Sequence, residues 1–194
     1  MRDIITHVKN VLTPEECQAI IDDQLPRVQQ GMVGGGKMVA LKVRKSQVSF
    51  IRGKDHPLRP LVKRLHNIIT DIAWKVHQTE ITFFEDAQFT AYKPIGFYKA
   101  HVDVQRVAPM RTISATIELS DPKNYIGGGI TIHNHPKSKV QPKERGGLIT
   151  FPSLSLHEAN TVWWGNRYSL VIWGLERHPS ETDPNLPKWK KQPS

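Results

Sequence analysis

The spacing of apolar residues changes near residue 79, and this change constrains the fold more than any other feature of the chain. Before it, apolar residues recur at the three- and four-residue spacing of helices; after it, they alternate with polar residues. Turn-forming stretches interrupt the alternation: KPIG, SDPKNYIGGG, HPKSKVQPKERGG and WWGN. We therefore expect a series of short strands, at residues 80–93, 97–104, 111–120, 129–133, 146–151, 156–162 and 167–175.

Two helices are predicted in the N-terminal part of the chain. Thr13, Pro14 and Glu16 suit the N-cap, the first turn and the third position of a capping box. The second helix is expected over residues 56–78, and a strand, SQVSFIRG, is expected before it. The apolar faces of the two helices would consist of Cys17, Ile20, Ile21 and Leu25, and of Leu58, Leu61, Leu65, Ile68, Ile69, Ile72 and Ala73.

Two helices followed by many short strands predict a mainly β fold, a β-sandwich or jelly roll with the helices packed outside. At 194 residues, the chain is long enough for one domain with a sizeable core. We expect a helical part over residues 1–78 and a β core over residues 80–175, together forming a domain over 1–175. A basic, proline-rich tail that is extended or disordered would follow over residues 176–194.

The segment from residue 34 to residue 52 begins with glycines and continues into KVRKSQVSFIR. Flexible loops beside a rigid barrel commonly carry specificity, so we predict that this segment closes over the substrate and that Arg44 contacts it. The alternative is a mobile surface connection without any contact to substrate.

The net charge and the cysteine content limit which classes of function the protein can have. The net charge is +9 and the isoelectric point about 9.7, which favours acidic partners in general. The basic residues are spread along the chain without a recognisable nucleic-acid motif, so we do not expect a nucleic-acid partner. The single cysteine, Cys17, excludes an internal disulfide and a thiolate metal cluster. Because the sequence shows no run of about 18 apolar residues and no signal peptide, we expect a cytoplasmic protein that makes no membrane contact. We also expect a monomer or a homodimer.

Three residues have the chemistry of a metal site. His101 and Asp103 stand two apart in YKAHVDVQ, and residues two apart in a strand point to the same face of a sheet. His157, in FPSLSLHEAN, would complete a set of two imidazoles and one carboxylate from a distant strand. That set suits non-haem Fe(II), because it leaves coordination positions open for substrate and O₂. The histidines of HNHP (133–136) are predicted to be loop residues, because Pro136 marks a turn.

Arg167 and Ser169 would also share one face of the last strand. An arginine can bind a carboxylate through two parallel hydrogen bonds, and a serine hydroxyl can add a third. We therefore predict that they hold a carboxylate, as the distal end of 2-oxoglutarate would require; the alternative is that Arg167 is a surface cation on the strand. Tyr92 and Tyr98 flank the first strand of the site, where either hydroxyl could bond the cosubstrate or the substrate; the alternative is that they are ordinary buried tyrosines.

Three stretches of the sequence carry a resemblance to a known family: AYKPIGFYKAHVDVQ, RTISATIELSDPKNYIGGG and GGLITFPSLSLHEANTVWWGNRYSLVIWG. Through them the sequence resembles the Fe(II)- and 2-oxoglutarate-dependent dioxygenases of the prolyl 4-hydroxylase type. VLTPEECQAIID resembles the opening helix of that family, so the resemblance covers residues 8–175. It implies a double-stranded β-helix, the cupin-like jelly roll. It also implies iron held by His101, Asp103 and His157, 2-oxoglutarate held by Arg167 with help from Ser169, and ascorbate as the reductant.

Two features depart from parts of that family. Its collagen-type members carry lysine where this chain has Arg167, so the chain is more similar to the short microbial and oxygen-sensing members. Glu118 lies on a strand where relatives often have an uncharged polar or aromatic residue. If Glu118 faces the pocket, it could read a cationic substrate group or bond to the cosubstrate; otherwise it is a surface carboxylate. Tyr98, Arg44 and Trp173 are the other candidates for contact with the substrate.

The resemblance implies a hydroxylase of prolyl residues in a peptide or protein, with release of succinate and CO₂. Three alternatives stay open: an oxygenase of a free amino acid or other small molecule, a nucleic-acid demethylase, and a non-catalytic binding module on the same barrel. A demethylase needs aromatic side chains near the site to stack on a base, and Trp163 and Trp164 are the candidates. A short, single-domain hydroxylase would suit a bacterium or a virus of bacteria.

Overall fold

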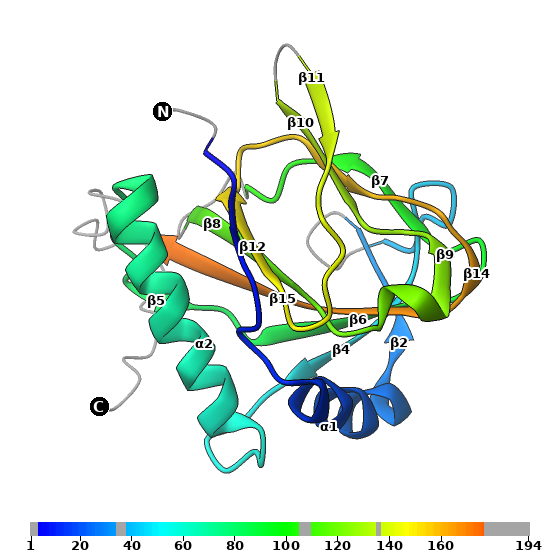
Figure 1. The fold of residues 1–194 in the computed structure, drawn as a ribbon, viewed down its shortest axis with the longest axis horizontal. Helices are drawn as coiled ribbons and strands as arrows, with labels where there is room; N and C mark the ends of the chain where they lie inside the picture. The colour runs from blue at the N-terminus through cyan, green and yellow to red at the C-terminus, as the bar shows by residue number, and fades with distance from the viewer. Residues whose placement is uncertain (1–3, 34–37, 105–109, 135–136, 177–194) are drawn as a thin grey trace.

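The computed structural model describes residues 4–33, 38–104, 110–134 and 137–176 (Figure 1). Its strands form an eight-stranded sheet, a five-stranded sheet and a two-stranded sheet. The eight-stranded sheet contains β1 (Thr6–Val8), β2 (Gln29–Gln30), β4 (Gln47–Ile51), β5 (Phe83–Phe84), β6 (Ala87–Tyr92), β8 (Met110–Glu118), β12 (Leu148–Pro152) and β15 (Arg167–Glu176). The five-stranded sheet contains β3 (Arg44–Lys45), β7 (Phe97–His101), β10 (Ile130–Asn134), β11 (Lys137–Val140) and β13 (His157–Ala159). The third sheet pairs β9 (Tyr125–Gly127) with β14 (Val162–Gly165).

The two larger sheets face each other across a cavity. In the eight-stranded sheet the order is β1-β12-β8-β15-β6-β4-β2, with β5 paired to β15 off this path. In the five-stranded sheet the order is β11-β10-β13-β7-β3. The cavity is lined by β7 and β13 on one side and by β6, β8 and β15 on the other. This antiparallel jelly roll confirms the predicted fold class.

The central strands of the eight-stranded sheet have one apolar and one more polar face, because successive side chains point to opposite sides. The residues in the core shared with the helices are Ala87, Phe89, Ala91, Ile113, Ala115, Ile117, Leu170 and Ile172. Residues that alternate with them line the cavity: Gln88, Thr90, Tyr92, Ser114, Thr116, Arg167, Ser169, Val171 and Trp173. One face therefore anchors the fold, and the other supplies the site.

The first helix, α1 (Pro14–Gln24), confirms its predicted capping box. The Glu16 amide donates to Thr13 Oγ1 at 3.2 Å, and the Thr13 amide donates to Glu16 Oε2 at 2.9 Å. Cys17, Ile20 and Ile21 of the predicted stripe are buried. Figure 1 shows α1 on the side of the eight-stranded sheet that is opposite to β7 and β10. A 3₁₀ turn (Leu25–Arg27) follows the helix.

The second helix, α2 (Arg59–Ile72), begins three residues later than predicted, with a proline in its first turn. It continues as a π-helical turn (Ala73–His77), and its buried face includes Val62, Leu65 and Ile69. Both helices pack into one hydrophobic core with the eight-stranded sheet, as expected. A third short helix, a 3₁₀ turn over Pro122–Asn124, precedes β9. Among the described residues, neither α-helix is long and apolar enough to span a membrane.

Several predicted boundaries are wrong. The strand predicted at 80–93 is split into β5 and β6, and the predicted turn WWGN lies mostly within β14. The predicted turn HPKSKVQPKERGG contains β11. β14 and β11 form because β9 and β10 offer them pairing partners, which a local pattern does not reveal. The predicted tail, apart from Glu176 at the end of β15, lies outside the described residues.

The prediction that residues 34–52 close over the substrate is wrong for β4, near the end of this segment. β4 pairs with both β2 and β6, so it is an inner strand of the eight-stranded sheet. Residues 34–37 lie outside the described residues. Next to them, Val33 and Met38 form an isolated bridge.

Candidate functional site

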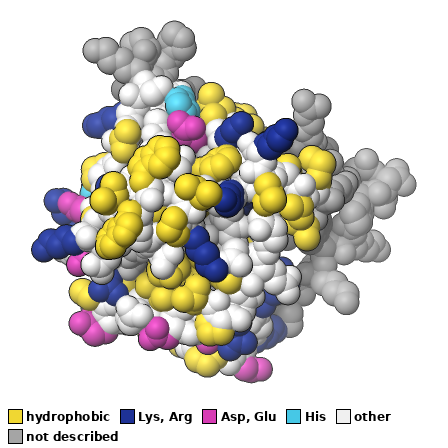
Figure 2. Space-filling view, turned by 90° about the vertical axis from the view of Figure 1, so that its right-hand side faces the viewer, with side chains coloured by type: hydrophobic (Ala, Val, Ile, Leu, Met, Phe, Trp, Pro, Cys, Tyr) yellow, Lys and Arg dark blue, Asp and Glu magenta, His cyan; other side chains and the backbone are white. Residues whose placement is uncertain are grey.

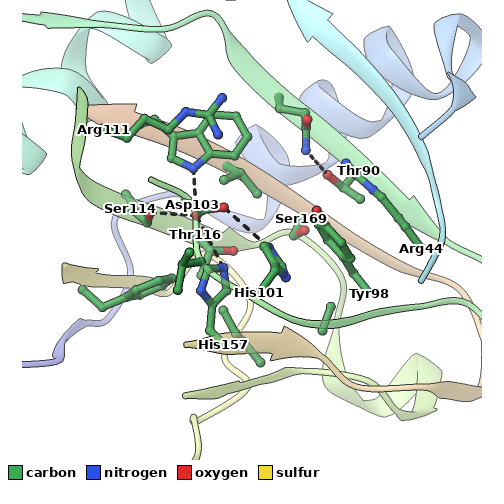
Figure 3. Close-up of a pocket in the computed structure, with 18 of the residues that line it drawn as sticks. Arg44, Thr90, Tyr98, His101, Asp103, Arg111, Ser114, Thr116, His157 and Ser169 are labelled. Atoms are coloured by element: carbon green, nitrogen blue, oxygen red, sulfur yellow. Dashed lines mark hydrogen bonds and ion pairs between the residues drawn. The ribbon is translucent and has the colours of Figure 1, made fainter. Parts of the chain in front are cut away.

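The structure brings the three predicted metal ligands together at one end of the cavity. His101 is the last residue of β7, His157 is the first of β13, and the two are paired in the register of these strands. His101 Nε2 lies 3.5 Å from Asp103 Oδ1, and His157 Nε2 lies 3.4 Å from Asp103 Oδ2. One ligand atom from each residue lies within 4.8 Å of the others. Figure 3 shows the three side chains pointing toward one another.

Asp103 does not lie on one strand with His101, although the spacing of two residues predicted that it would. β7 ends at His101, and Asp103 follows in the connecting segment. Its amide donates a hydrogen bond of 2.9 Å to the carbonyl oxygen of Ser153, the residue after β12. The carboxylate is therefore positioned by a contact with a distant strand end rather than by the geometry of one strand.

Backbone carbonyls orient both imidazole rings. His101 Nδ1 lies 2.8 Å from the Lys99 carbonyl oxygen, and His157 Nδ1 lies 2.9 Å from that of Ser155. A carbonyl oxygen can only accept, so each Nδ1 carries a proton and Nε2 is the ring atom that would bind a metal. Burial lowers the pKa of His157, with the Asp103 charge acting against it, and this favours the neutral ring that binds metal.

Two hydrogen bonds to one oxygen of the Asp103 carboxylate fix its orientation. Its Oδ2 accepts hydrogen bonds from Ser114 Oγ at 2.7 Å and from Trp173 Nε1 at 2.9 Å. Burial raises the pKa of Asp103, but its contacts with the two imidazoles and with Trp173 outweigh this and hold the pKa below its ordinary value. Oδ1 is left for a metal ion, with the carboxylate ionised at neutral pH.

This donor set fits Fe(II). Two imidazoles and one carboxylate would supply three ligands to one ion, and all three residues line the cavity, where substrate and O₂ could reach the ion. Outer hydrogen bonds to all three ligands are present, as is usual for a built metal site. Thiolate ligands are absent from the described trio, which excludes a zinc-finger-like structural site there.

The cavity has a volume of about 310 Å³ and holds both parts of the predicted site. His101, Asp103 and His157 line it together with Arg167 and Ser169. Asp103 is the one carboxylate among the described lining residues, whereas three arginines line the cavity: Arg44, Arg111 and Arg167. With its carboxylate committed to a metal, the cavity is suited to an anionic small molecule.

Arg167 and Ser169 lie where the prediction placed them, on the cavity face of β15. Arg167 is buried, and its guanidinium carbon is 5.3 Å from the centre of the Tyr92 ring. Tyr92 is also buried and lines the cavity; burial raises the pKa of its hydroxyl. A buried guanidinium beside two hydroxyl groups suits a carboxylate at this position.

Glu118, whose orientation the sequence left open, is neither a surface carboxylate nor one of the described residues that line the cavity. Its Oε2 accepts a hydrogen bond of 2.8 Å from Arg167 Nε. Burial raises the pKa of Glu118, while the Arg167 charge acts in the opposite direction and favours the carboxylate form. Glu118 therefore contacts the predicted cosubstrate arginine and not the cavity itself.

Two candidates for substrate contact stack next to the metal ligands. The Tyr98 ring lies 3.7 Å from the His101 ring, centre to centre, in a stacked arrangement. The Arg44 guanidinium carbon lies 4.7 Å from the Tyr98 ring centre, and its Nε donates to Ser46 Oγ at 2.8 Å. Both residues line the cavity (Figure 3), as their predicted role requires.

Trp173 also lines the cavity, but its indole N–H is engaged with Asp103. Arg111 also lines the cavity, but it was not predicted from the sequence. Its guanidinium carbon lies 3.8 Å from the centre of the Trp173 ring, and its Nε donates a hydrogen bond to Glu85. Ser114 was also missed. A buried serine within the apolar strand ISATI was the available signal, because buried polar groups need partners.

The other candidates lie outside the cavity. Trp163 and Trp164 are 67% and 62% exposed, on the face where β9 and β14 lie. Figure 2 shows that face, with hydrophobic side chains gathered among lysines and arginines. His133 is the fourth residue of β10, not a loop residue, and its Nε2 lies 3.3 Å from Glu158 Oε1.

Comparison with known proteins agrees with this chemistry. The family model described as the 2OG-Fe(II) oxygenase superfamily matches residues 87–174. A PKHD-type hydroxylase of Teredinibacter turnerae is 34% identical over 102 residues, 50% of this chain and 45% of that protein. A PKHD-type hydroxylase of Acinetobacter baumannii is 27% identical over 184 residues, 88% of this chain and 77% of that protein. The chain thus spans less than half the length of the first relative and most of the second.

Two solved structures share the fold. A prolyl-4-hydroxylase from Pseudomonas putida is 16% identical, with a TM-score of 0.73 over 91% of this chain and 95% of its own. A prolyl hydroxylase from Trichoplax adhaerens, in complex with a peptide fragment of the hypoxia inducible factor oxygen degradation domain, is 15% identical. Its TM-score is 0.75, over 90% of this chain and 84% of its own. At these identities the similarity is one of fold.

Proposed function

Because the chain belongs to the 2OG-Fe(II) oxygenase superfamily, we propose that it hydroxylates prolyl residues in a peptide or protein, with 2-oxoglutarate and O₂ as cosubstrates. One observation carries the proposal. The set of two histidines and one aspartate and the Arg167–Ser169 pair lie in the same cavity of about 310 Å³. A small dicarboxylate could therefore reach a metal ion with one end and a guanidinium with the other.

In this proposal, each part of the cavity has a separate task. His101, Asp103 and His157 hold Fe(II), and Arg167, Ser169 and Tyr92 bind the distal carboxylate of 2-oxoglutarate. When bound, iron and 2-oxoglutarate supply the oxidising chemistry with O₂, and succinate and CO₂ are released. The protein keeps the carboxylate ligand ionised, fixes the imidazole tautomers and orients the substrate within the cavity.

Prolyl substrates are supported by the relatives. The curated relatives are named PKHD-type hydroxylases, and the structures of similar fold are named prolyl hydroxylases, one of them bound to a peptide. In this chain, Tyr98 and Trp173 supply aromatic walls beside the metal ligands. Such walls suit the apolar ring of proline. We also propose ascorbate as the reductant that sustains turnover.

The test measures succinate formed with Fe(II), ascorbate and 2-oxoglutarate, with and without a panel of proline-containing peptides, and the mass of each peptide. We expect peptide-dependent succinate and the gain of one oxygen on proline. Asp103→Ala, which removes the charged metal ligand, should abolish both. If Asp103→Ala turns over 2-oxoglutarate like the wild type, the ligand assignment is wrong.

Other outcomes of the same assay would replace the proposed substrate. Succinate without peptide stimulation would indicate a free amino acid or another small molecule. Nucleic acid has less support, because Trp163 and Trp164, its predicted stacking residues, are exposed and are not among the residues that line the cavity. Absence of succinate with Fe(II) bound would indicate a non-catalytic barrel.

A further inference from the structure

At the edge of the cavity, Arg167 and Glu118 form a buried ion pair between two neighbouring strands. Glu118 is the last residue of β8 and Arg167 is the first of β15. Their side chains are 7% and 5% exposed, and Arg167 Nε donates to Glu118 Oε2 at 2.8 Å. Arg167 lines the cavity, whereas Glu118 is not among the described residues that do so. Glu118 is paired with Ser169 and shares the face of β8 with Thr116, so its carboxylate contacts the arginine on the cavity side of the sheet, next to the described lining.

The surroundings restrict where the guanidinium can go. A Cβ atom at Gly128 would lie 2.9 Å from Arg167 Cδ and 3.0 Å from Tyr125 Cε2, so this glycine leaves the space that both side chains occupy. Tyr92 lies against the guanidinium within the cavity. The buried Tyr125 hydroxyl is a polar neighbour of both Glu118 and Arg167, and burial raises its pKa. Among the described residues, Glu118 is the charged partner of this arginine.

We propose that Glu118 is a positioning residue that holds Arg167 for the cosubstrate and at the same time weakens the attraction of this subsite for the distal carboxylate. The inference rests on the proposed function, because it takes Arg167 as the group that binds 2-oxoglutarate.

The positioning part follows from the geometry of arginine. The guanidinium presents five N–H groups in a planar fork, and Glu118 occupies the one on Nε. The two terminal nitrogens remain for a carboxylate in the cavity, in the two-point geometry that arginine forms with carboxylates.

The electrostatic part follows from the charges. Paired with Glu118, Arg167 presents a subsite with no net charge, and a carboxylate ligand is attracted by the guanidinium and repelled by Glu118. Both charges are buried, where water screens them poorly. Removal of the Glu118 charge, with its hydrogen bond retained, should therefore strengthen binding of a dicarboxylate and not of a ligand without the distal charge.

The test measures dissociation constants by titration calorimetry, with Mn(II) in place of Fe(II) so that no turnover occurs. The ligands are 2-oxoglutarate and 2-oxopentanoate, which carries a methyl group in place of the distal carboxylate. The proteins are the wild type, Glu118→Gln, Glu118→Ala and Arg167→Gln, each first shown to be folded by circular dichroism. Glutamine can still accept from Arg167 Nε, whereas alanine removes both the charge and the acceptor.

We expect Glu118→Gln to bind 2-oxoglutarate about tenfold more tightly than wild type, the order of magnitude for removing one like charge at an effective dielectric constant of about 20. Its affinity for 2-oxopentanoate should not change. Glu118→Ala should bind 2-oxoglutarate more weakly than Glu118→Gln, because its Arg167 is no longer anchored.

The Arg167→Gln variant is the control, and its weaker binding of 2-oxoglutarate would confirm the cosubstrate site. Given that result, either of two others would overturn the role of Glu118. One is an unchanged affinity of Glu118→Gln, and the other is equal affinity of the alanine and glutamine variants. Both would leave the proposed cosubstrate site intact. If Arg167→Gln binds 2-oxoglutarate like wild type, the proposed cosubstrate site is wrong, and the role of Glu118 is wrong with it.

Discussion

The indole N–H of Trp173 donates a hydrogen bond of 2.9 Å to Oδ2 of Asp103, which joins a wall of the cavity to a candidate metal ligand. The same indole ring lies under the Arg111 guanidinium, with 3.8 Å between the guanidinium carbon and the ring centre. Arg111 is in turn fixed by Glu85, which accepts from its Nε at 2.7 Å. A chain of contacts from Glu85, the residue after β5, to Asp103 therefore holds the carboxylate in one orientation.

Substitution of Trp173 by phenylalanine should weaken metal binding. The ring is kept, but the hydrogen bond that orients Asp103 is lost, and loss of such outer hydrogen bonds typically weakens metal affinity by about 10- to 100-fold. Titration of Mn(II) or Co(II) by calorimetry measures the effect. Trp164→Phe, on the exposed face, is the matched control and should bind metal like wild type. Equal affinities of the two variants would contradict the role of Trp173.

Substitution of Ser169 by alanine should raise the KM for 2-oxoglutarate. A hydrogen bond to a charged group contributes about 1.5–3 kcal/mol, so we expect an increase of about tenfold or more. The kcat should change little, because the bond to the distal carboxylate is present in both ground and transition states. Steady-state succinate formation measures both constants. Ser49→Ala, which removes a hydroxyl bonded to the Gln24 carbonyl oxygen outside the cavity, is the control. An unchanged KM would remove Ser169 from the cosubstrate site.

Protonation of His66 should lower the free energy of unfolding of the protein in mild acid. The His66 ring stacks on Phe84, with 4.0 Å between ring centres, and burial together with the Arg59 charge lowers its pKa to about 4. The unfolded chain, in which a histidine has a pKa near 6.5, binds more protons below that pH. Stability from this residue is therefore complete above pH 6.5 and is lost as the pH falls toward 4, by about 1–3 kcal/mol.

The comparison variant is His66→Phe, which keeps an aromatic ring against Phe84 but cannot be protonated. Urea unfolding at pH 7 and pH 5 gives the free energy of unfolding of each protein. The wild type should lose more stability than His66→Phe between the two pH values. Equal losses would show that His66 does not titrate on unfolding.

Cys17 should resist alkylation in the folded protein. It is fully buried in α1, and burial raises the pKa of its thiol to about 11, so the reactive thiolate is scarce at pH 8. Mass spectrometry after iodoacetamide treatment should show little modification in buffer and complete modification in denaturant. Rapid modification of the native protein would mean that α1 detaches readily from the sheet.

Features that depend on neighbouring residues in the chain were predictable from the sequence. The capping box of α1 joins Thr13 to Glu16, three residues apart, and both of its hydrogen bonds are present. The longer strands, such as β8 and β15, alternate over enough residues to be recognised. Strands of two to four residues, such as β3, β11 and β14, are too short to show a period, and they form where a partner strand is already in place.

The residue types of the candidate site were also determined by the sequence alone: two imidazoles and a carboxylate for a metal, and a guanidinium with a hydroxyl for a carboxylate. Only the tertiary structure decided how these groups are held. Asp103 lies beyond the end of β7 because its amide bonds to Ser153, fifty residues along the chain. Glu118 turned out to be the partner of Arg167, because pairing of β8 with β15 places the two residues at one corner of the sheet. Such contacts join residues far apart in sequence, and a pattern in one segment carries no record of the segment that packs against it.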